Sequence, residues 1–192
     1  MIKVIAFDYS QVVAQGPITS WIQKNVPPDD NRHQLFKTHS KRWDAGDMTL
    51  TEIYQVLSEL TGVAPEKLWE EFYVKSPLNK EVVALIKELK VNYKIILFSN
   101  FFAQLLRRLL KHHGITDLFD EIIISSEHKM IKPNSDFFEL LVKKSGAKKE
   151  EIIFTDDLKE NIDGANMFGI KAIQFKNCEQ LIKDLQTAGI KI

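Results

Sequence analysis

The stretch "MIKVIAFDYSQVVAQGP" (residues 1–17) begins with an apolar run that ends at a single carboxylate, Asp8. A hydroxyl group, Ser10, follows two positions later. Short continuous apolar runs are typical of strands that are buried on both faces of a parallel sheet. The stretch therefore predicts a buried strand over residues 2–8, with polar groups placed at its carboxyl end.

From residue 80 onward, further runs of this kind alternate with segments of helical periodicity. The predicted strands are 93–100, 119–125, 151–157 and 170–175, and the predicted helices are 79–91, 102–114, 135–146 and 159–169. Alternating strands and helices are typical of a parallel sheet with right-handed crossovers. We therefore expect an α/β fold with a doubly wound parallel sheet.

The segment after the first strand breaks this alternation. Its apolar and aromatic residues recur at helical spacing, as in "TLTEIYQVLSELTG", where we expect Thr51 to cap a helix. The simplest account is a helical cap over residues 14–78, inserted into a core made of residues 1–13 and 79–192.

Composition limits the classes of partner. The chain has 192 residues, and its 26 basic residues balance its 26 acidic ones, so no global field attracts nucleic acid or a membrane surface. Its one cysteine excludes an internal disulfide and suits a reducing compartment. We expect a cytoplasmic protein, monomeric or homodimeric, with a small-molecule partner.

Polar residues stand at the predicted strand ends: Asp8, Ser99, Asn100, Asp156 and Asp157, with Lys132 in a later loop. Taken singly, each has an ordinary explanation as a helix cap or a turn residue. Together they would meet at the edge of the sheet where ligands bind. Carboxylates at two strand ends suit Mg²⁺, a lysine and a hydroxyl suit phosphoryl oxygens, and an aspartate can attack phosphorus.

The order Asp8, Ser99, Lys132-Pro133, Asp156-Asp157 and Asn161 resembles the haloacid dehalogenase (HAD) superfamily. The resemblance covers nearly the whole chain and is clearest from "KPNSDFFELL" to "GIKAI". It implies a Rossmann-like core with a helical cap after the first strand. Within the superfamily, the chain is most similar to the capped subfamily I, among sugar-phosphate phosphatases and epoxide-hydrolase N-terminal-like phosphatases.

The resemblance also implies roles for individual residues. Asp8 would be the nucleophile and a direct magnesium ligand. The backbone carbonyl of Ser10 and the side chain of Asp157 would complete the metal shell, helped by Asp156 and by Asn161 behind them.

The phosphate site is implied in the same way. Ser99 and the Asn100 amide would orient the transferring phosphoryl group, and Lys132 would neutralise charge on Asp8 and on phosphate. The predicted function is a Mg²⁺-dependent phosphatase that acts on a small phosphomonoester of the sugar-phosphate type through an aspartyl-phosphate.

Ser10 departs from the family pattern, in which phosphatases carry a second aspartate here as general acid and base. Loss of such help costs on the order of 10²–10⁴ in rate. One hypothesis is a phosphatase that is slow or uses a good leaving group, such as an anomeric phosphate. A second is a phosphate- or partner-binding protein with impaired catalysis. A third is a 2-haloacid dehalogenase, although the related dehalogenases carry a tyrosine at this position and Tyr9 lies one place early.

Overall fold

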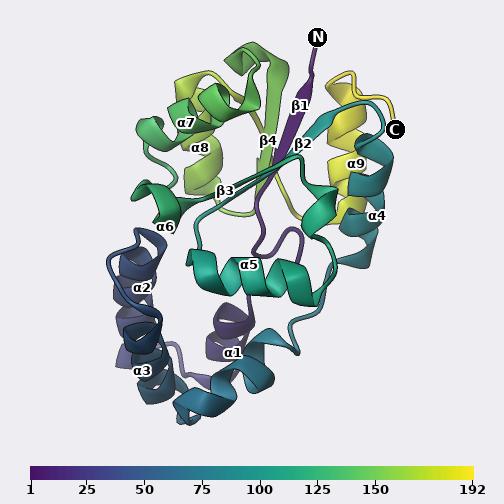
Figure 1. Cartoon of the computed structure of the whole chain (residues 1–192). Coiled ribbons are helices and arrows are strands. Elements are labelled where there is room, and N and C mark those ends of the chain that lie inside the picture. Colours follow the sequence, from purple (N-terminus) through teal and green to yellow (C-terminus); the bar gives the residue numbers. More distant parts are fainter.

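The computed structural model describes residues 1–192 except for the side chain at position 17. Five strands form one parallel sheet in the order β3-β2-β1-β4-β5 (Figure 1). The strands are β1 Val4–Phe7, β2 Lys94–Ser99, β3 Glu121–Ile124, β4 Ile152–Asp156 and β5 Lys171–Gln174. All five predicted strands are present, each somewhat shorter than expected.

Helices cover both faces of the sheet. On one face, strand residues such as Phe7 and Leu97 pack into a cluster with α4, α5 and α9. On the other face, Ala6 and Phe98 pack with α7 and α8. Successive strand residues are thus buried on opposite faces, which explains the continuous apolar runs. The bounds are α4 Lys80–Leu89, α5 Ala103–His112, α6 Ser125–His128, α7 Ser135–Ser145, α8 Lys159–Phe168 and α9 Cys178–Thr187, with short helical turns η3 Thr116–Leu118 and η4 Lys149–Glu151.

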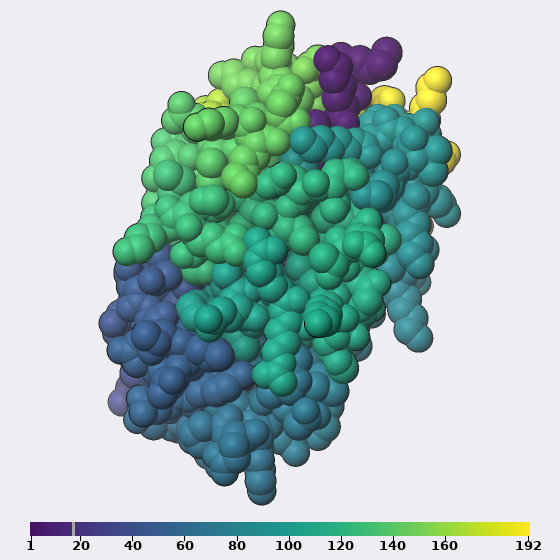
Figure 2. Space-filling model, viewed as in Figure 1, coloured from purple at the N-terminus to yellow at the C-terminus, as the bar shows by residue number. Residues whose placement is uncertain are grey.

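A helical insert lies between β1 and α4, at the end of the sheet toward which the strands run (Figure 1). It contains α1 Pro17–Asn25, α2 Asn31–Asp44, α3 Leu50–Thr61, η1 Pro65–Lys67 and the π-helix η2 Trp69–Tyr73. Insert residues such as Leu57 and Phe72 belong to the same apolar cluster as Phe7. Figure 2 shows the insert in direct contact with the core. The domain boundaries at 13/14 and 78/79 stay a prediction.

Some local predictions need correction. The N-cap of α3 is Thr49, not Thr51, because Thr49 and Glu52 form a capping box there. The helix α9 was not predicted from the sequence. Among the described residues, no helix has the length and apolar character needed to cross a membrane.

Candidate active site

The carboxyl ends of the central strands bring the predicted acidic residues together. Asp8 directly follows β1, and its backbone N–H donates to the Thr155 carbonyl of β4 (2.9 Å). Because Phe7 and Thr155 are paired in the sheet register, Asp8 and Asp156 come at the same height. The chain order reverses at β1 and β4, and ligands of open α/β sheets bind at such a reversal. Asp8, Lys132, Asp156 and Asp157 are called the strand-end cluster below.

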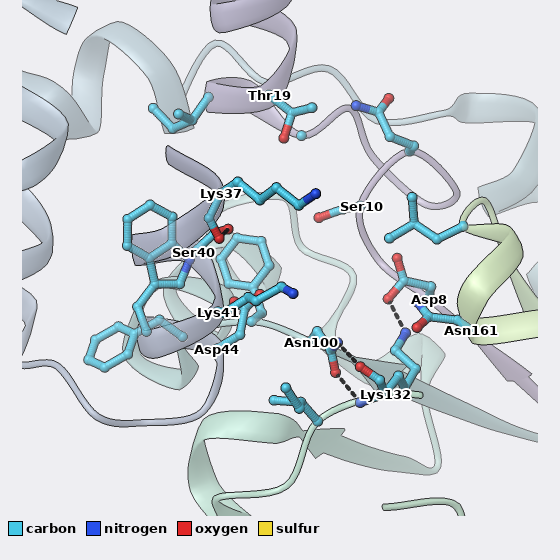
Figure 3. A pocket seen from close by; sticks show the side chains of 18 of the residues that line it. Asp8, Ser10, Thr19, Lys37, Ser40, Lys41, Asp44, Asn100, Lys132 and Asn161 are labelled. Carbon is cyan, nitrogen blue, oxygen red and sulfur yellow. Dashed lines mark hydrogen bonds and ion pairs between the residues drawn. The ribbon is translucent and has the colours of Figure 1, made fainter. Parts of the chain in front are cut away.

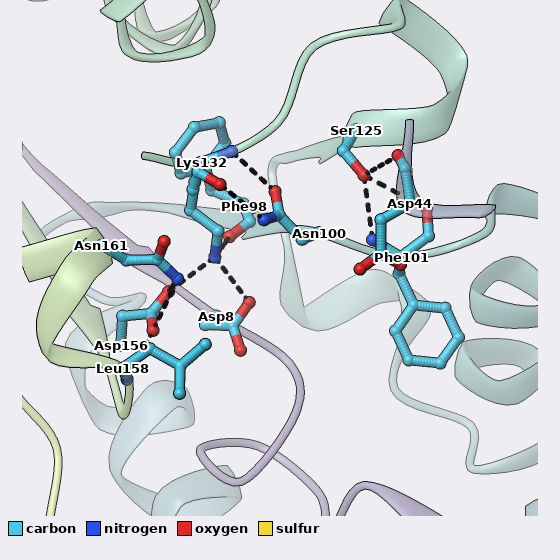
Figure 4. A network of polar contacts seen from close by, with 10 residues as sticks. All are labelled: Asp8, Asp44, Phe98, Asn100, Phe101, Ser125, Lys132, Asp156, Leu158 and Asn161. Carbon is cyan, nitrogen blue, oxygen red and sulfur yellow. Dashed lines mark hydrogen bonds and ion pairs between the residues drawn. The ribbon is translucent and has the colours of Figure 1, made fainter. Parts of the chain in front are cut away.

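The Lys132 ammonium lies at the centre of the strand-end cluster (Figure 4). It donates to Oδ1 of Asp8 (2.7 Å), to Oδ2 of Asp156 (2.6 Å) and to the Phe98 carbonyl (3.0 Å). Burial alone would lower the pKa of Lys132, but the two carboxylates outweigh it and the pKa is raised. Since an ammonium has three N–H donors, this geometry uses all of them. Lys132 thus fixes Asp8, and it would act on a bound phosphate through its charge.

Two contacts hold the Lys132 main chain in place. The Asn100 side-chain amide donates to the Lys132 carbonyl (3.0 Å), and the Lys132 N–H donates to Oδ1 of Asn100 (2.8 Å). On the other side, a Cβ on Gly164 of α8 would lie 2.7 Å from the Pro133 Cβ, so only glycine allows this close approach. Asn100 therefore connects the end of β2 to the lysine loop.

Asp156 differs from its neighbours because both of its oxygens are bonded within the protein. Besides the ammonium on Oδ2, Oδ1 accepts from the Leu158 N–H (2.9 Å), and Asn161 Nδ2 lies 3.0 Å from each oxygen. Asp156 and Asn161 are both buried. Asp156 therefore serves in this geometry mainly to position Lys132 and Asn161.

The carboxylates of Asp8, Asp156 and Asp157 each offer an oxygen within 4.8 Å of the others, a donor set that suits Mg²⁺. Burial, followed by the charges of Asp8 and Asp156, raises the pKa of Asp157 to about 7. Burial also raises the pKa of Asp8 to about 6 against the opposing effect of Lys132. Such crowded carboxylates are stabilised by a cation. Asp8 and Asp157 fit direct ligation, since Asp156 is already engaged.

The two predicted serines lie at different depths. Ser10 is half-buried and lines the cavity described below, just before Gln11, which has a left-handed backbone (φ 62°). Ser99 is fully buried, and its hydroxyl forms no hydrogen bond of full geometry with the described groups. The hydroxyl is nevertheless close enough to the Asp8 carboxylate to lower the pKa of Asp8. Ser99 thus lies beside Asp8, below the described lining of the cavity. Its predicted role toward phosphate stays a prediction.

A cavity of about 490 Å³ separates the strand-end cluster from the insert (Figure 3). Its polar side includes Asp8, Ser10, Asn100, Lys132, Asp157 and Asn161. Its apolar side is formed by residues of the insert and of the α5 region, namely Ile18, Phe36, Trp43, Ile53, Tyr73, Phe101, Phe102 and Leu105. The cavity thus offers an ionic end at the sheet and an aromatic surface at the insert, beside polar groups of α2.

The helix α2 contributes polar groups that belong to none of the sequence motifs. Lys37, Ser40, Lys41 and Asp44 line the cavity and are called the α2 wall below (Figure 3). One feature of the sequence points to Asp44: it ends a helix, where the helix dipole disfavours a negative charge. The lysines have no such distinguishing feature, because exposed lysines are common on helices.

Comparison with known proteins agrees with this geometry. The fold and the strand-end cluster define an α/β protein with an acidic site at a strand reversal. The sequence pattern of the haloacid dehalogenase-like hydrolases matches residues 2–169, and the chain belongs to this family.

Curated relatives match only parts of their own length. The sesquiterpene phosphatase astK of Aspergillus oryzae is 32% identical over 90 residues, which are 46% of this chain and 46% of that protein. The pyrimidine 5'-nucleotidase YjjG of Escherichia coli is 28% identical over 56% of this chain and 50% of its own. The drimenol cyclase drtB of Aspergillus calidoustus is 24% identical over 96% of this chain and 36% of its own. The chain thus spans half or less of these relatives.

Solved structures share the fold. The HAD family enzyme bt-2542 of Bacteroides thetaiotaomicron has a TM-score of 0.73 at 21% identity, covering 92% of this chain and 94% of that one. The same enzyme is known in complex with magnesium and inorganic phosphate. The L-2-haloacid dehalogenase of Xanthobacter autotrophicus, with chloropropionic acid covalently bound, has a TM-score of 0.68 at 18% identity, covering 100% of this chain and 85% of its own.

Proposed function

We propose that this hydrolase is a Mg²⁺-dependent phosphatase that cleaves a phosphomonoester through an aspartyl-phosphate on Asp8. The observation that carries the proposal is the position of Asp8. Lys132 holds its Oδ1 at 2.7 Å, and Asp8 lines the cavity together with Asp157. A carboxylate that is held in place, ionised near neutral pH and open to a cavity is what nucleophilic attack requires.

Each residue of the site has a separate role in the proposed reaction. Lys132 keeps Asp8 ionised and oriented, and the charge of Lys132 offsets that of an incoming phosphate. Asp8 and Asp157, with the Ser10 carbonyl, would hold Mg²⁺. When bound, Mg²⁺ supplies positive charge that orients the phosphoryl oxygens and stabilises their developing charge. Asp8 then attacks phosphorus, the ester bond breaks, and water later releases phosphate from Asp8.

Relatives support this chemistry. Two of the curated relatives are a phosphatase and a nucleotidase, which are both phosphomonoester hydrolases by name. A structural relative binds magnesium together with inorganic phosphate. These properties belong to those proteins, and they favour phosphoryl chemistry at the corresponding strand ends here.

The cavity lining bears on the substrate class. A sugar phosphate needs several hydrogen-bonding groups around its ring, whereas a large part of this cavity is lined by aromatic and aliphatic side chains of the insert and of the α5 region, beside the polar groups of the α2 wall. This lining favours a phosphomonoester with an apolar or aromatic organic group. A panel that compares prenyl, aryl and sugar phosphates by kcat/KM tests this point, since sugar phosphates are preferred under the hypothesis drawn from the sequence.

Two other functions remain candidates because of particular observations. Ser10 in place of an acid favours a protein that binds Mg²⁺ and phosphate with little turnover. The fold shared with a haloacid dehalogenase favours carbon–halogen cleavage by Asp8. The clustering of Asp8 and Asp157 argues against the latter, because halide displacement does not need a cation to hold a phosphoryl group.

The test is phosphate release from para-nitrophenyl phosphate, with and without Mg²⁺, by the wild type and Asp8→Asn. We expect metal-dependent release that falls on the order of 10⁴-fold or more in the variant. Asp117→Asn is a matched control, because Asp117 is an exposed aspartate away from the described cavity lining. Retained Mg²⁺ and phosphate binding without turnover of any phosphomonoester would support the binding protein, and chloride release from 2-chloropropionate would support the dehalogenase.

A further inference from the structure

Asp44 is an acid that the motifs do not explain, yet it lines the same cavity as Asp8. It is the last residue of α2 and is half-buried. Figure 3 shows it on the α2 wall, across the cavity from Asp8, with Lys41 beside it. An acid at the end of a helix is disfavoured by the helix dipole, so its place here needs a reason other than helix stability.

The main chain around Asp44 is fixed to the core. The Ser125 hydroxyl donates to the Asp44 carbonyl (2.6 Å) and accepts from the Phe101 N–H (3.0 Å) (Figure 4). Two residues later, a Cβ on Gly46 would lie 2.5 Å from the Ser126 carbonyl oxygen, so the chain passes too close to α6 for any other residue. The end of α2 is therefore held at a fixed distance from the strand-end cluster.

The carboxyl group of Asp44 has no such bonds. Among the described residues, none donates a hydrogen bond to it or forms an ion pair with it. The charged and titratable groups that line the cavity with Asp44 are Asp8, Lys132, Asp157 and Glu160 from the core, and Lys37, Lys41 and Tyr73 from the insert. Burial and then the charge of Asp8 raise the pKa of Asp44 to about 8, against Lys132. This direction of the pKa favours the protonated form of Asp44, which is the form that a general acid needs.

Resting on the proposed phosphatase function, we propose that Asp44 is the general acid of this site and supplies the proton that Ser10 cannot. As Asp8 Oδ bonds to phosphorus and the ester P–O bond breaks, Asp44 gives its proton to the leaving oxygen, which departs as an alcohol. In the second step Asp44 accepts a proton from the attacking water. The hydroxide oxygen bonds to phosphorus, the bond to Asp8 breaks, and phosphate leaves with Asp8 and Asp44 restored.

The experiment compares Asp44→Asn with wild type on phosphate esters of graded leaving group: dinitrophenyl, para-nitrophenyl, phenyl and alkyl. A good leaving group needs no proton, so we expect less than about threefold loss of kcat with dinitrophenyl phosphate and about 10²-fold or more with phenyl and alkyl phosphates. Asp47→Asn is the matched control, because Asp47 is an exposed aspartate in the same turn. It should leave every rate unchanged.

Two further measurements separate an acid from a structural residue. In the double variant Ser10→Asp/Asp44→Asn, the rate of hydrolysis of alkyl phosphates should be at least tenfold higher than in Asp44→Asn, because a carboxyl group at position 10 can again donate the proton. The wild-type kcat on phenyl phosphate should fall above pH about 8, and this decline should be absent in Asp44→Asn.

A uniform loss across all leaving groups, or no loss with any of them, would overturn the role of Asp44. Circular dichroism and thermal melting of Asp44→Asn should match the wild type, since the substitution removes an unpaired acid. Failure of the proposed function is distinguishable, because wild-type hydrolysis of dinitrophenyl phosphate would then be absent or would survive Asp8→Asn.

Discussion

The two sides of the cavity are built in opposite ways. On the sheet side, all five residues of β4, which ends in Asp156 of the strand-end cluster, are buried. The hydrogen-bonding groups of Lys132 and Asp156 are satisfied within the protein. In α2, none of the fourteen residues is buried. None of the ion pairs found among the described residues includes Lys37, Lys41 or Asp44.

This difference indicates a division of labour. Groups that are fixed by several hydrogen bonds need little reorganisation free energy during a reaction. The strand-end cluster therefore suits the chemical step. Groups that are partly exposed and unpaired are free to bond with a ligand, so the α2 wall suits recognition of the organic part of a substrate and, at Asp44, proton transfer. Substitutions on the two sides should therefore differ in kind: stability and turnover on one, substrate affinity and leaving-group dependence on the other.

The largest contrast is expected between two lysines. Lys132→Met leaves Asp8 and Asp156 buried without their cation and should lower the free energy of unfolding by about 3–5 kcal/mol. Lys41→Met removes an exposed charge and should change it by less than about 0.5 kcal/mol. Urea denaturation of both variants measures this. Equal losses would mean that the strand-end cluster is no more preorganised than the α2 wall.

The pH dependence of stability tests the crowding of carboxylates. Asp8 and Asp157 have pKa values raised to about 6 and about 7, so the folded state binds protons more tightly than the unfolded chain. Their stabilising contribution is complete below pH about 4 and is lost as the pH rises through these values. In the absence of metal, thermal melting in this range should therefore show falling stability with rising pH, and Mg²⁺ should reverse the fall near pH 7. A metal-free protein that gains stability over the same range would contradict the crowding.

A smaller effect is expected at the junction between insert and core. Ser125→Ala removes the hydroxyl that bonds to the Asp44 carbonyl and leaves the half-buried Phe101 N–H without an acceptor. The cost should be about 1–3 kcal/mol of unfolding free energy. The variant should also lose activity with alkyl phosphates more than with dinitrophenyl phosphate, because Asp44 is no longer held. The exposed Thr116→Ala is a control for loss of a hydroxyl.

The smallest effect is expected for Lys37→Ala and Lys41→Ala. Both side chains line the cavity from the insert's side and touch none of the strand-end cluster, so each should raise KM for an anionic substrate about threefold to tenfold and leave kcat unchanged. Steady-state kinetics beside Lys24→Ala, an exposed lysine of α1, checks this. A fall in kcat with unchanged KM would place these lysines in the chemical step.

The sequence allows the strand-end cluster to be predicted but not the α2 wall, for a physical reason. Apolar runs identify the strands, and parallel pairing places their ends at one edge, so Asp8, Asp156 and Asp157 follow from their positions at those ends, whereas Lys132 lies in a loop and follows from the family pattern. The place of Asp44 depends on how the insert packs on the core, through contacts such as that of Ser125, which no periodicity encodes. The cap of α3 is a different case, because the capping-box spacing of Thr49 and Glu52 is present in the sequence and the prediction of Thr51 missed it.

The most direct test of the account is to trap the covalent intermediate. Enzyme is mixed with Mg²⁺ and dinitrophenyl phosphate, quenched in acid within one turnover, and digested. The mass of the peptide that contains Asp8 is then measured by mass spectrometry. We expect this peptide to gain one phosphoryl group, hydroxylamine to remove that group, and Asp8→Asn to abolish its formation. Turnover with no phosphoryl group on this peptide, or with one on another residue, would mean that Asp8 is not the nucleophile.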